Sequence, residues 1–243
     1  MGHKKRILLL AKIFTVLLAC SSVSHSFADL HGTLTGTTDY IGRGYTKSAG
    51  GYAIQGNLDY EHKSGVYFGA SASNVNFGDR AYSDSAKVEI APYLGYTHQL
   101  SGKWRVDVQW TRYLYDGKLF GREADYNEFY LFLNYSDLFT LRAGISDSYF
   151  NQNAVTGDYE FTARYPITDY LQISSGLGYS QVEKVLEYDY LYWNAGITAY
   201  YKFIAADLRY MQSYEATIAP VTSWRYDPEP LSPTVVFSLS VGF

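Results

Sequence analysis

The feature that most constrains the fold is an alternation of apolar and polar residues that recurs about a dozen times along the chain. A period of two places successive side chains on opposite faces of a β-strand. The recurring segments are about ten residues long, which is the length of a strand that crosses a bilayer. In the last of them, residues 232–243, the apolar face consists of Val235, Phe237, Leu239, Val241 and Phe243. A closing strand that ends on an aromatic residue is similar to the signal that inserts β-barrels into outer membranes.

Residues 1–28 have the features of a signal peptide. Lys4, Lys5 and Arg6 precede a short apolar run, and Ser26-Phe27-Ala28 offers a small-x-small cleavage site. Removing these residues takes away four basic residues, no acidic residue and the single cysteine, Cys20, which leaves 16 basic and 24 acidic residues and a net charge of −8. Such a balance argues against nucleic acid as a partner. Residues 29–243 are therefore expected to form the mature domain.

The mature chain has no candidate for a transmembrane helix, because its longest run of apolar residues is the five-residue stretch from Phe129 to Leu133. The fold class predicted instead is an all-β transmembrane antiparallel β-barrel of about 12 strands. The predicted strands are Leu30–Arg43, Tyr52–Tyr60, Val66–Asn74, Val88–Tyr96, Trp104–Trp110, Phe129–Tyr135, Phe139–Ile145, Tyr159–Tyr165, Leu171–Tyr179, Trp193–Tyr201, Ile204–Tyr210 and Ser232–Phe243.

The connections between these segments alternate in length, as they do in outer-membrane barrels. Residues 136–138 and 166–169 are short turns, whereas residues 76–85, 116–124 and 215–231 are long and polar. Short turns belong on the periplasmic side and long loops outside the cell. Tyr60, Tyr96, Tyr135, Tyr165 and Tyr201 each end a strand at the turn side, where they would form an interfacial aromatic girdle. Pro92 falls inside a strand, so we expect a bulge or a missing ladder bond there.

The opposite face of the strands carries charges, which cannot face lipid cheaply and must line the lumen. The inward polar positions include Gln55, Asn57, Asp59, Lys87 and Gln109. The candidate pore-lining residues are Asp39, Arg43, Glu89, Arg105, Asp107, Glu128, Arg142, Glu160, Arg164, Asp207 and Arg209. Two interpretations follow: a narrow hydrophilic channel, or a salt-bridge network that fills the barrel without conducting.

The order of these charges along the strands predicts a selectivity. Arg105, Arg142 and Arg164 lie toward the periplasmic ends of their strands, and Lys87, Glu89, Glu128 and Glu160 toward the outer ends. A solute would meet a mainly acidic entrance and then a basic ring, which would favour anions if it lay at the constriction.

The stretch from Thr37 to Asp79 resembles a family of proteobacterial outer-membrane proteins, the TorF-type porins. The matching pieces are Thr38-Asp39-Tyr40, Arg43-Gly44, Gln55 with Asp59-Tyr60, Ser64 to Gly69, and Ser73-Asn74-Val75. The resemblance covers about residues 34 to 79, and it implies a porin without naming a solute.

Together these features predict a porin-like channel for passive passage of small polar solutes or ions in the outer membrane of a Gram-negative bacterium. Its expected partners are outer-membrane lipid, lipopolysaccharide and, during insertion, the barrel-assembly machinery. A non-conducting structural or adhesin-type barrel is one alternative, and an outer-membrane enzyme is another. We predict no enzymatic activity, because the mature histidines, His31, His62 and His98, all fall at the turn side and none is placed near an outward or loop serine with an acid partner. No cofactor or metal motif is present.

Overall fold

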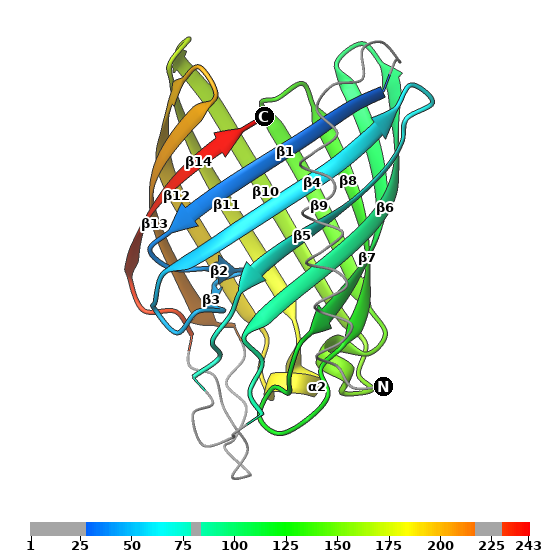
Figure 1. The fold of residues 1–243 in the computed structure, drawn as a ribbon, viewed down its shortest axis with the longest axis vertical. Coiled ribbons are helices and arrows are strands. Elements are labelled where there is room, and N and C mark those ends of the chain that lie inside the picture. Colours follow the sequence, from blue (N-terminus) through cyan, green and yellow to red (C-terminus); the bar gives the residue numbers. More distant parts are fainter. Residues whose placement is uncertain (1–27, 79–83, 217–229) are drawn as a thin grey trace.

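In the computed structural model, which describes residues 28–78, 84–216 and 230–243, twelve strands close into one antiparallel barrel (Figure 1). Each strand pairs with its neighbours along the chain, and the last strand pairs with the first. The barrel strands are β1 Ala28–Thr37, β4 Ala53–His62, β5 Val66–Asn74, β6 Val88–Ser101, β7 Trp104–Tyr115, β8 Tyr126–Tyr135, β9 Phe139–Ser146, β10 Thr156–Thr168, β11 Leu171–Gln181, β12 Tyr190–Tyr201, β13 Ile204–Glu215 and β14 Thr234–Gly242. The predicted fold class and strand number are confirmed.

The two ends of the barrel differ as the connection lengths predicted. At one end, which also holds the carboxy-terminus, turns of two or three residues join the strands (Figure 1, top). The opposite end carries the longer loops, a 3₁₀ turn η1 (Tyr149–Asn151) and a short helix α2 (Glu183–Leu186). Residues 79–83 and 217–229, parts of two predicted loops, lie outside the described residues, as do residues 1–27 of the predicted signal peptide. No helix within the described residues is long and apolar enough to cross a membrane.

The structure tests three local predictions, which concern residues 166–168, Pro92 and Lys87. Residues 166–168, predicted as part of a turn, belong to β10, where a bulge between Pro166 and Thr168 allows the strand to continue. Pro92, which has no N–H, has no partner in the ladder between β6 and β7, and neither does Ala91, although the register is the same on both sides. The expected break in pairing at Pro92 is confirmed. Lys87, predicted to point inward from a strand, lies exposed in the loop before β6.

The outer surface of the barrel is apolar at alternate positions, as a lipid-facing wall requires. Large side chains that are exposed on this face include Leu34, Phe68, Leu94, Leu131, Leu141, Phe161, Leu177, Leu208 and Leu239. At the turn end, Tyr165 and Tyr201 are each 65% exposed and occupy the predicted girdle level. These positions alternate with inward polar residues, so the wall separates an apolar outside from a polar inside.

Phe243 completes the seam between the first and last strands. Its backbone exchanges two hydrogen bonds with Gly32 of β1, at 2.8 and 2.9 Å. A Cβ at Gly32 would overlap the Phe243 ring, so the glycine provides the space into which the terminal ring packs. The terminal aromatic residue is therefore part of barrel closure.

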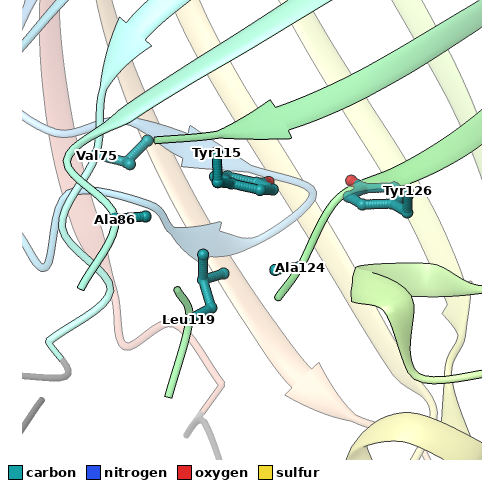
Figure 2. Close-up of a cluster of buried hydrophobic side chains, with 6 residues drawn as sticks. All are labelled: Val75, Ala86, Tyr115, Leu119, Ala124 and Tyr126. Atoms are coloured by element: carbon teal, nitrogen blue, oxygen red, sulfur yellow. The ribbon is translucent and has the colours of Figure 1, made fainter. Parts of the chain in front are cut away.

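Buried apolar side chains gather at the loop end rather than in the middle of the barrel. One cluster contains Val75, Ala86, Tyr115, Leu119, Ala124 and Tyr126 (Figure 2). A second contains Val182, Tyr188, Tyr190 and Tyr192. These two clusters hold the long loops against the barrel rim, and they support the segment described next.

Candidate functional site in the barrel lumen

The first connection of the chain folds into the lumen. The first strand ends at Thr37, not at Arg43 as predicted, and residues 41–46 form a small hairpin of strands β2 (Ile41–Gly42) and β3 (Tyr45–Thr46). Its two turn residues, Arg43 and Gly44, have φ angles of 51° and 76°, as a type I′ turn requires. A Cβ at Gly44 would lie 2.6 Å from the Cβ of Tyr192, so the backbone can approach the wall here only with glycine.

Asp39 organises the segment that leads into the β2–β3 hairpin. Its carboxylate accepts hydrogen bonds from the hydroxyls of Thr46, at 2.6 Å, and Ser48, at 2.7 Å. Its backbone carbonyl accepts one from Thr37, at 2.8 Å. The residue is buried, and the predicted role of lining an open pore does not describe these contacts: Asp39 fixes the loop on which Arg43 is presented.

Arg43, at the tip of the hairpin, reaches the opposite wall. Its Nη2 lies 2.6 Å from Oε2 of Glu128 on β8 and also donates to the Tyr130 hydroxyl, while its Nε lies 3.7 Å from Asp158 on β10. Burial alone would lower the pKa of Arg43, but the adjoining carboxylate of Glu128 raises it well above its usual value. The guanidinium therefore remains charged and ties the hairpin to β8 and β10.

Arg142 on β9 extends this ion-pair network. Its Nη2 contacts the carboxylates of Asp158 and, at 3.0 Å, Glu160, and the Tyr192 hydroxyl donates to Glu160 at 3.0 Å. Arg142 and Glu160 are direct cross-strand partners. The predicted separation of these two residues into an outer acidic level and an inner basic level is therefore wrong. Arg43 and Arg142 face the three carboxylates of Glu128, Asp158 and Glu160, so the network carries a formal excess of one negative charge.

Lys47, just after β3, ties the hairpin to a different part of the wall. Its Nζ lies 2.8 Å from Oε2 of Glu89 on β6, and the hydroxyls of Tyr40 and Tyr115 donate to the same carboxylate at 2.9 and 2.7 Å. Burial would lower the pKa of Lys47, but the neighbouring Glu89 outweighs it and raises that pKa. Glu89 thus accepts three hydrogen bonds, which is what a buried carboxylate needs.

The third side of the hairpin contacts β12 and β13. Ser213 donates from its hydroxyl to the backbone oxygen of Gly44 at 2.9 Å. The ring of Tyr45 packs edge-on against Tyr190 with 4.6 Å between centroids, and its hydroxyl is bonded to that of Tyr188. Contacts with β6, β8, β10, β12 and β13 mean that the hairpin extends across the lumen at the loop end.

The hairpin leaves a polar space beside it. A cavity of about 210 Å³ lies between Tyr40 and the wall formed by β1, β4, β5 and β6. Most of its lining residues are polar, with hydroxyl, amide or carboxylate side chains. The polar residues are Thr33, Thr35, Gln55, Asn57, Ser71, Ser73 and Glu89. The cavity therefore extends from Tyr40 along the polar inner face of these four strands.

The remaining predicted residues lie on the strands further toward the turn end, and most of them contact neighbouring wall residues. Arg209 contacts Asp207 at 3.0 Å and donates to Asn194 at 2.6 Å. Asp107 accepts from the Tyr67 hydroxyl at 2.6 Å, and Arg164 donates to Thr140 at 3.0 Å. Arg105 is exposed.

Several residues that hold the hairpin are not among the predicted pore-lining residues. Asp158, two residues from Glu160 and therefore on the same strand face, could have been found by extending that strand. Lys47, Tyr40 and the wall tyrosines Tyr130 and Tyr192 gave no such signal, because their roles depend on a loop that folds back over a long sequence distance.

The comparisons with known proteins agree with this architecture. The chain belongs to a bacterial protein family of unknown function, Gcw_chp, whose model matches residues 22–243. Among solved structures, a KdgM porin superposes with a TM-score of 0.54 at 8% identity, over 88% of this chain and 98% of that one. An outer-membrane channel from Pseudomonas putida F1 superposes with a TM-score of 0.50 at 8% identity, over 92% of this chain and 97% of that one. At such identities the similarity shows the fold. No curated protein matches the sequence.

Proposed function

We propose that the protein is an outer-membrane channel for passive passage of small polar solutes or ions, narrowed at its loop end by the β2–β3 hairpin. The observation that carries the proposal is the polar cavity of about 210 Å³ between Tyr40, which precedes the hairpin, and the wall of β1, β4, β5 and β6. A lumen lined by hydroxyls and amides can replace part of the hydration shell of a passing solute. Twelve strands enclose more space than the eight whose interior side chains can fill, and less than an open sixteen-stranded pore.

The charge arrangement supports small solutes over large ones. Arg43 and Lys47 are each engaged by carboxylates of the wall, so the hairpin is held in the lumen by ion pairs. A solute must pass beside this segment. The size of the remaining space favours ions and small polar molecules over bulky cargo.

The finer assignments are part of the same proposal. The resemblance of residues 34–79 supports a TorF-type porin, and the apolar outer wall supports a location in the outer membrane with lipid and lipopolysaccharide as partners. The short turns would face the periplasm, residues 1–28 would be removed as a signal peptide, and the barrel-assembly machinery would read the last strand.

Two alternatives rest on specific contacts. A filled, non-conducting barrel is favoured by the same ion pairs, because they close part of the lumen. An enzyme is less well supported: Nδ1 of His62 lies 2.9 Å from Oγ of Ser64, but both belong to an exposed turn outside the lumen, and no acid completes the pair among the hydrogen bonds of the described residues.

Swelling of proteoliposomes tests the proposal against the filled barrel. Liposomes that contain the refolded protein should swell in isotonic arabinose and not in isotonic maltohexaose, and heat-unfolded protein is the control. Swelling in arabinose no faster than in protein-free liposomes would contradict the channel.

A further inference from the structure

A second cavity lies on the outer side of the β2–β3 hairpin. It has a volume of about 360 Å³, and its floor is formed by the hairpin residues Gly42, Tyr45, Thr46 and Lys47. Its walls come from the β5–β6, β7–β8, β9–β10 and β11–β12 connections. The cavity therefore lies at the loop end of the barrel, on the hairpin.

Six aromatic side chains line the cavity: Tyr45, Phe77, Phe120, Tyr149, Phe150 and Tyr190. They are held in fixed positions by edge-to-face and tilted contacts, with 6.2 Å between the centroids of Phe77 and Phe150 and 4.6 Å between those of Tyr149 and Phe150. Behind them are the two buried clusters, of which the first, with Tyr115 and Tyr126, appears in Figure 2. The rings therefore form a preformed aromatic wall.

One residue of the aromatic wall, Phe150, has a strained backbone conformation. Phe150 has a φ of 46°, in the left-handed region that a bulky residue rarely adopts. Its ring contacts Tyr115, Tyr126 and Phe77 from that conformation. The surrounding packing must stabilise the strained residue, and the result is a ring presented to the cavity.

The charges around the cavity cancel. Lys47 at the floor is paired with Glu89 at 2.8 Å, and Arg122 and Glu123, of opposite sign, are both exposed. Burial raises the pKa of Tyr149 to about 12, so its hydroxyl stays uncharged at neutral pH. A charged solute would lose hydration on entering, and at the cavity it would meet charges of both signs.

We propose that this cavity is a binding site for small uncharged compounds that carry one aromatic ring and one or two hydroxyl groups. The ring would stack or pack edge-on against the aromatic wall. The exposed Gln152 is a polar lining residue whose side-chain amide would meet a hydroxyl group of the ligand, whereas the Thr46 hydroxyl is already bonded to Asp39. A cavity of about 150 Å³ is enough for benzene, so the space accommodates a substituted single ring. A monosaccharide fits less well, because several of its hydroxyls would lose water without gaining a partner.

Calorimetric titration of the detergent-refolded full chain with 4-hydroxybenzyl alcohol tests the site. Saturable binding at one site is expected, and its saturated analogue, 4-(hydroxymethyl)cyclohexanol, should bind on the order of tenfold more weakly because it lacks the ring quadrupole. The anion 4-hydroxybenzoate and glucose should also bind more weakly. Equal affinity for the ring and its saturated analogue, or tighter binding of the anion, would overturn the proposal.

Two variants locate the binding. Phe120→Ala removes a wall ring, and Val185→Trp fills the cavity from α2; each is expected to weaken binding on the order of tenfold. Phe203→Ala is the matched control, because Phe203 is exposed in a turn at the opposite end of the barrel. Unchanged affinity in both cavity variants would indicate partition into the micelle and contradict the site. An equal loss of affinity in the control would also contradict it, because the effect would not be specific to the cavity.

Passage of a bound aromatic compound through the barrel would rest on the proposed channel function. Binding of the compound in the cavity does not rest on that function. The titration needs no transport, and ion conductance needs no aromatic ligand. Binding without conductance would reject the channel and keep the site, whereas conductance without binding would reject the site and keep the channel.

Discussion

Replacing Arg43 with asparagine should release the hairpin while preserving its turn. Asparagine tolerates the left-handed φ of 51° at this position and is favoured before glycine in type I′ turns. The substitution therefore removes the guanidinium without adding backbone strain. Arg43→Asn is expected to raise the mean conductance of the barrel, because the hairpin would lose its contacts with β8 and β10.

The size of the effect follows from what the arginine leaves behind. The Glu128 side chain is 1% exposed, and its other hydrogen-bond donor among the described residues is the Tyr130 hydroxyl. Breaking a buried ion pair by removing one partner costs about 3–5 kcal/mol. Asp158 retains Arg142 and Ser180, so the cost falls mainly on Glu128. At about 1.4 kcal/mol per tenfold change, the ratio of undocked to docked hairpin should rise on the order of 10² to 10³.

Single-channel recording in planar bilayers measures this ratio as the fraction of time spent in the larger-conductance state. Arg164→Asn is the control, because Arg164 donates to Thr140 on the barrel wall and lies away from the hairpin. It should leave the fraction of time spent in the larger-conductance state unchanged. Identical step sizes and open fractions for the wild type and Arg43→Asn would refute the assignment of the hairpin as the constriction.

Docking of the hairpin should not weaken as the pH is raised moderately. Lys47 has its pKa raised above the ordinary value of 10.5 in the folded protein. A group of this kind stabilises the folded state fully below its unfolded pKa and loses that contribution only as the pH rises through the folded pKa. Conductance should therefore be flat from about pH 7 to about pH 9. A marked increase in conductance over that range would contradict the role of the Lys47–Glu89 pair.

The barrel wall, its orientation and its charge network each give a further expected outcome. Phe243→Ser should lower the amount of heat-modifiable folded protein in outer membranes, because the terminal ring packs across the closing seam; wild-type amounts would argue against this. An epitope inserted at Gln152 should be accessible on intact cells and one at Ser136 should not, and the reverse pattern would invert the proposed topology. Arg142→Ser removes the cation beside Glu160 and should shift the reversal potential toward cation preference; an unchanged potential would place the selective level elsewhere.

The strands could be predicted because their physical cause is local. Alternation decides which side chains face lipid, and it placed Val66–Asn74 at the same residues as β5. Strand ends at the loop side were less accurate: β8 begins at Tyr126, not at Phe129, because Tyr126 is buried by loops that the local pattern does not reveal. Beyond the lipid-facing level, packing between loops takes over from the alternation.

The hairpin could not be predicted for the same reason. Asp39 and Arg43 have the spacing of same-face strand residues, so they were assigned to a continuation of the first strand. The partner of Arg43, Glu128, is 85 residues away, and that contact exists only after the barrel has closed. Arg43 and Gly44 form the turn with positive φ at both residues, but an Arg-Gly pair is not one of the Asn-Gly or Asp-Gly pairs that indicate a hairpin.

Conductance of the refolded wild-type protein across a planar bilayer tests the channel most directly. Discrete current steps in the wild type, and larger steps in Arg43→Asn, are expected from a polar passage beside an ion-paired hairpin. Absence of conductance in both proteins, with both correctly folded as heat-modifiable barrels, would contradict the channel and establish the filled barrel in its place.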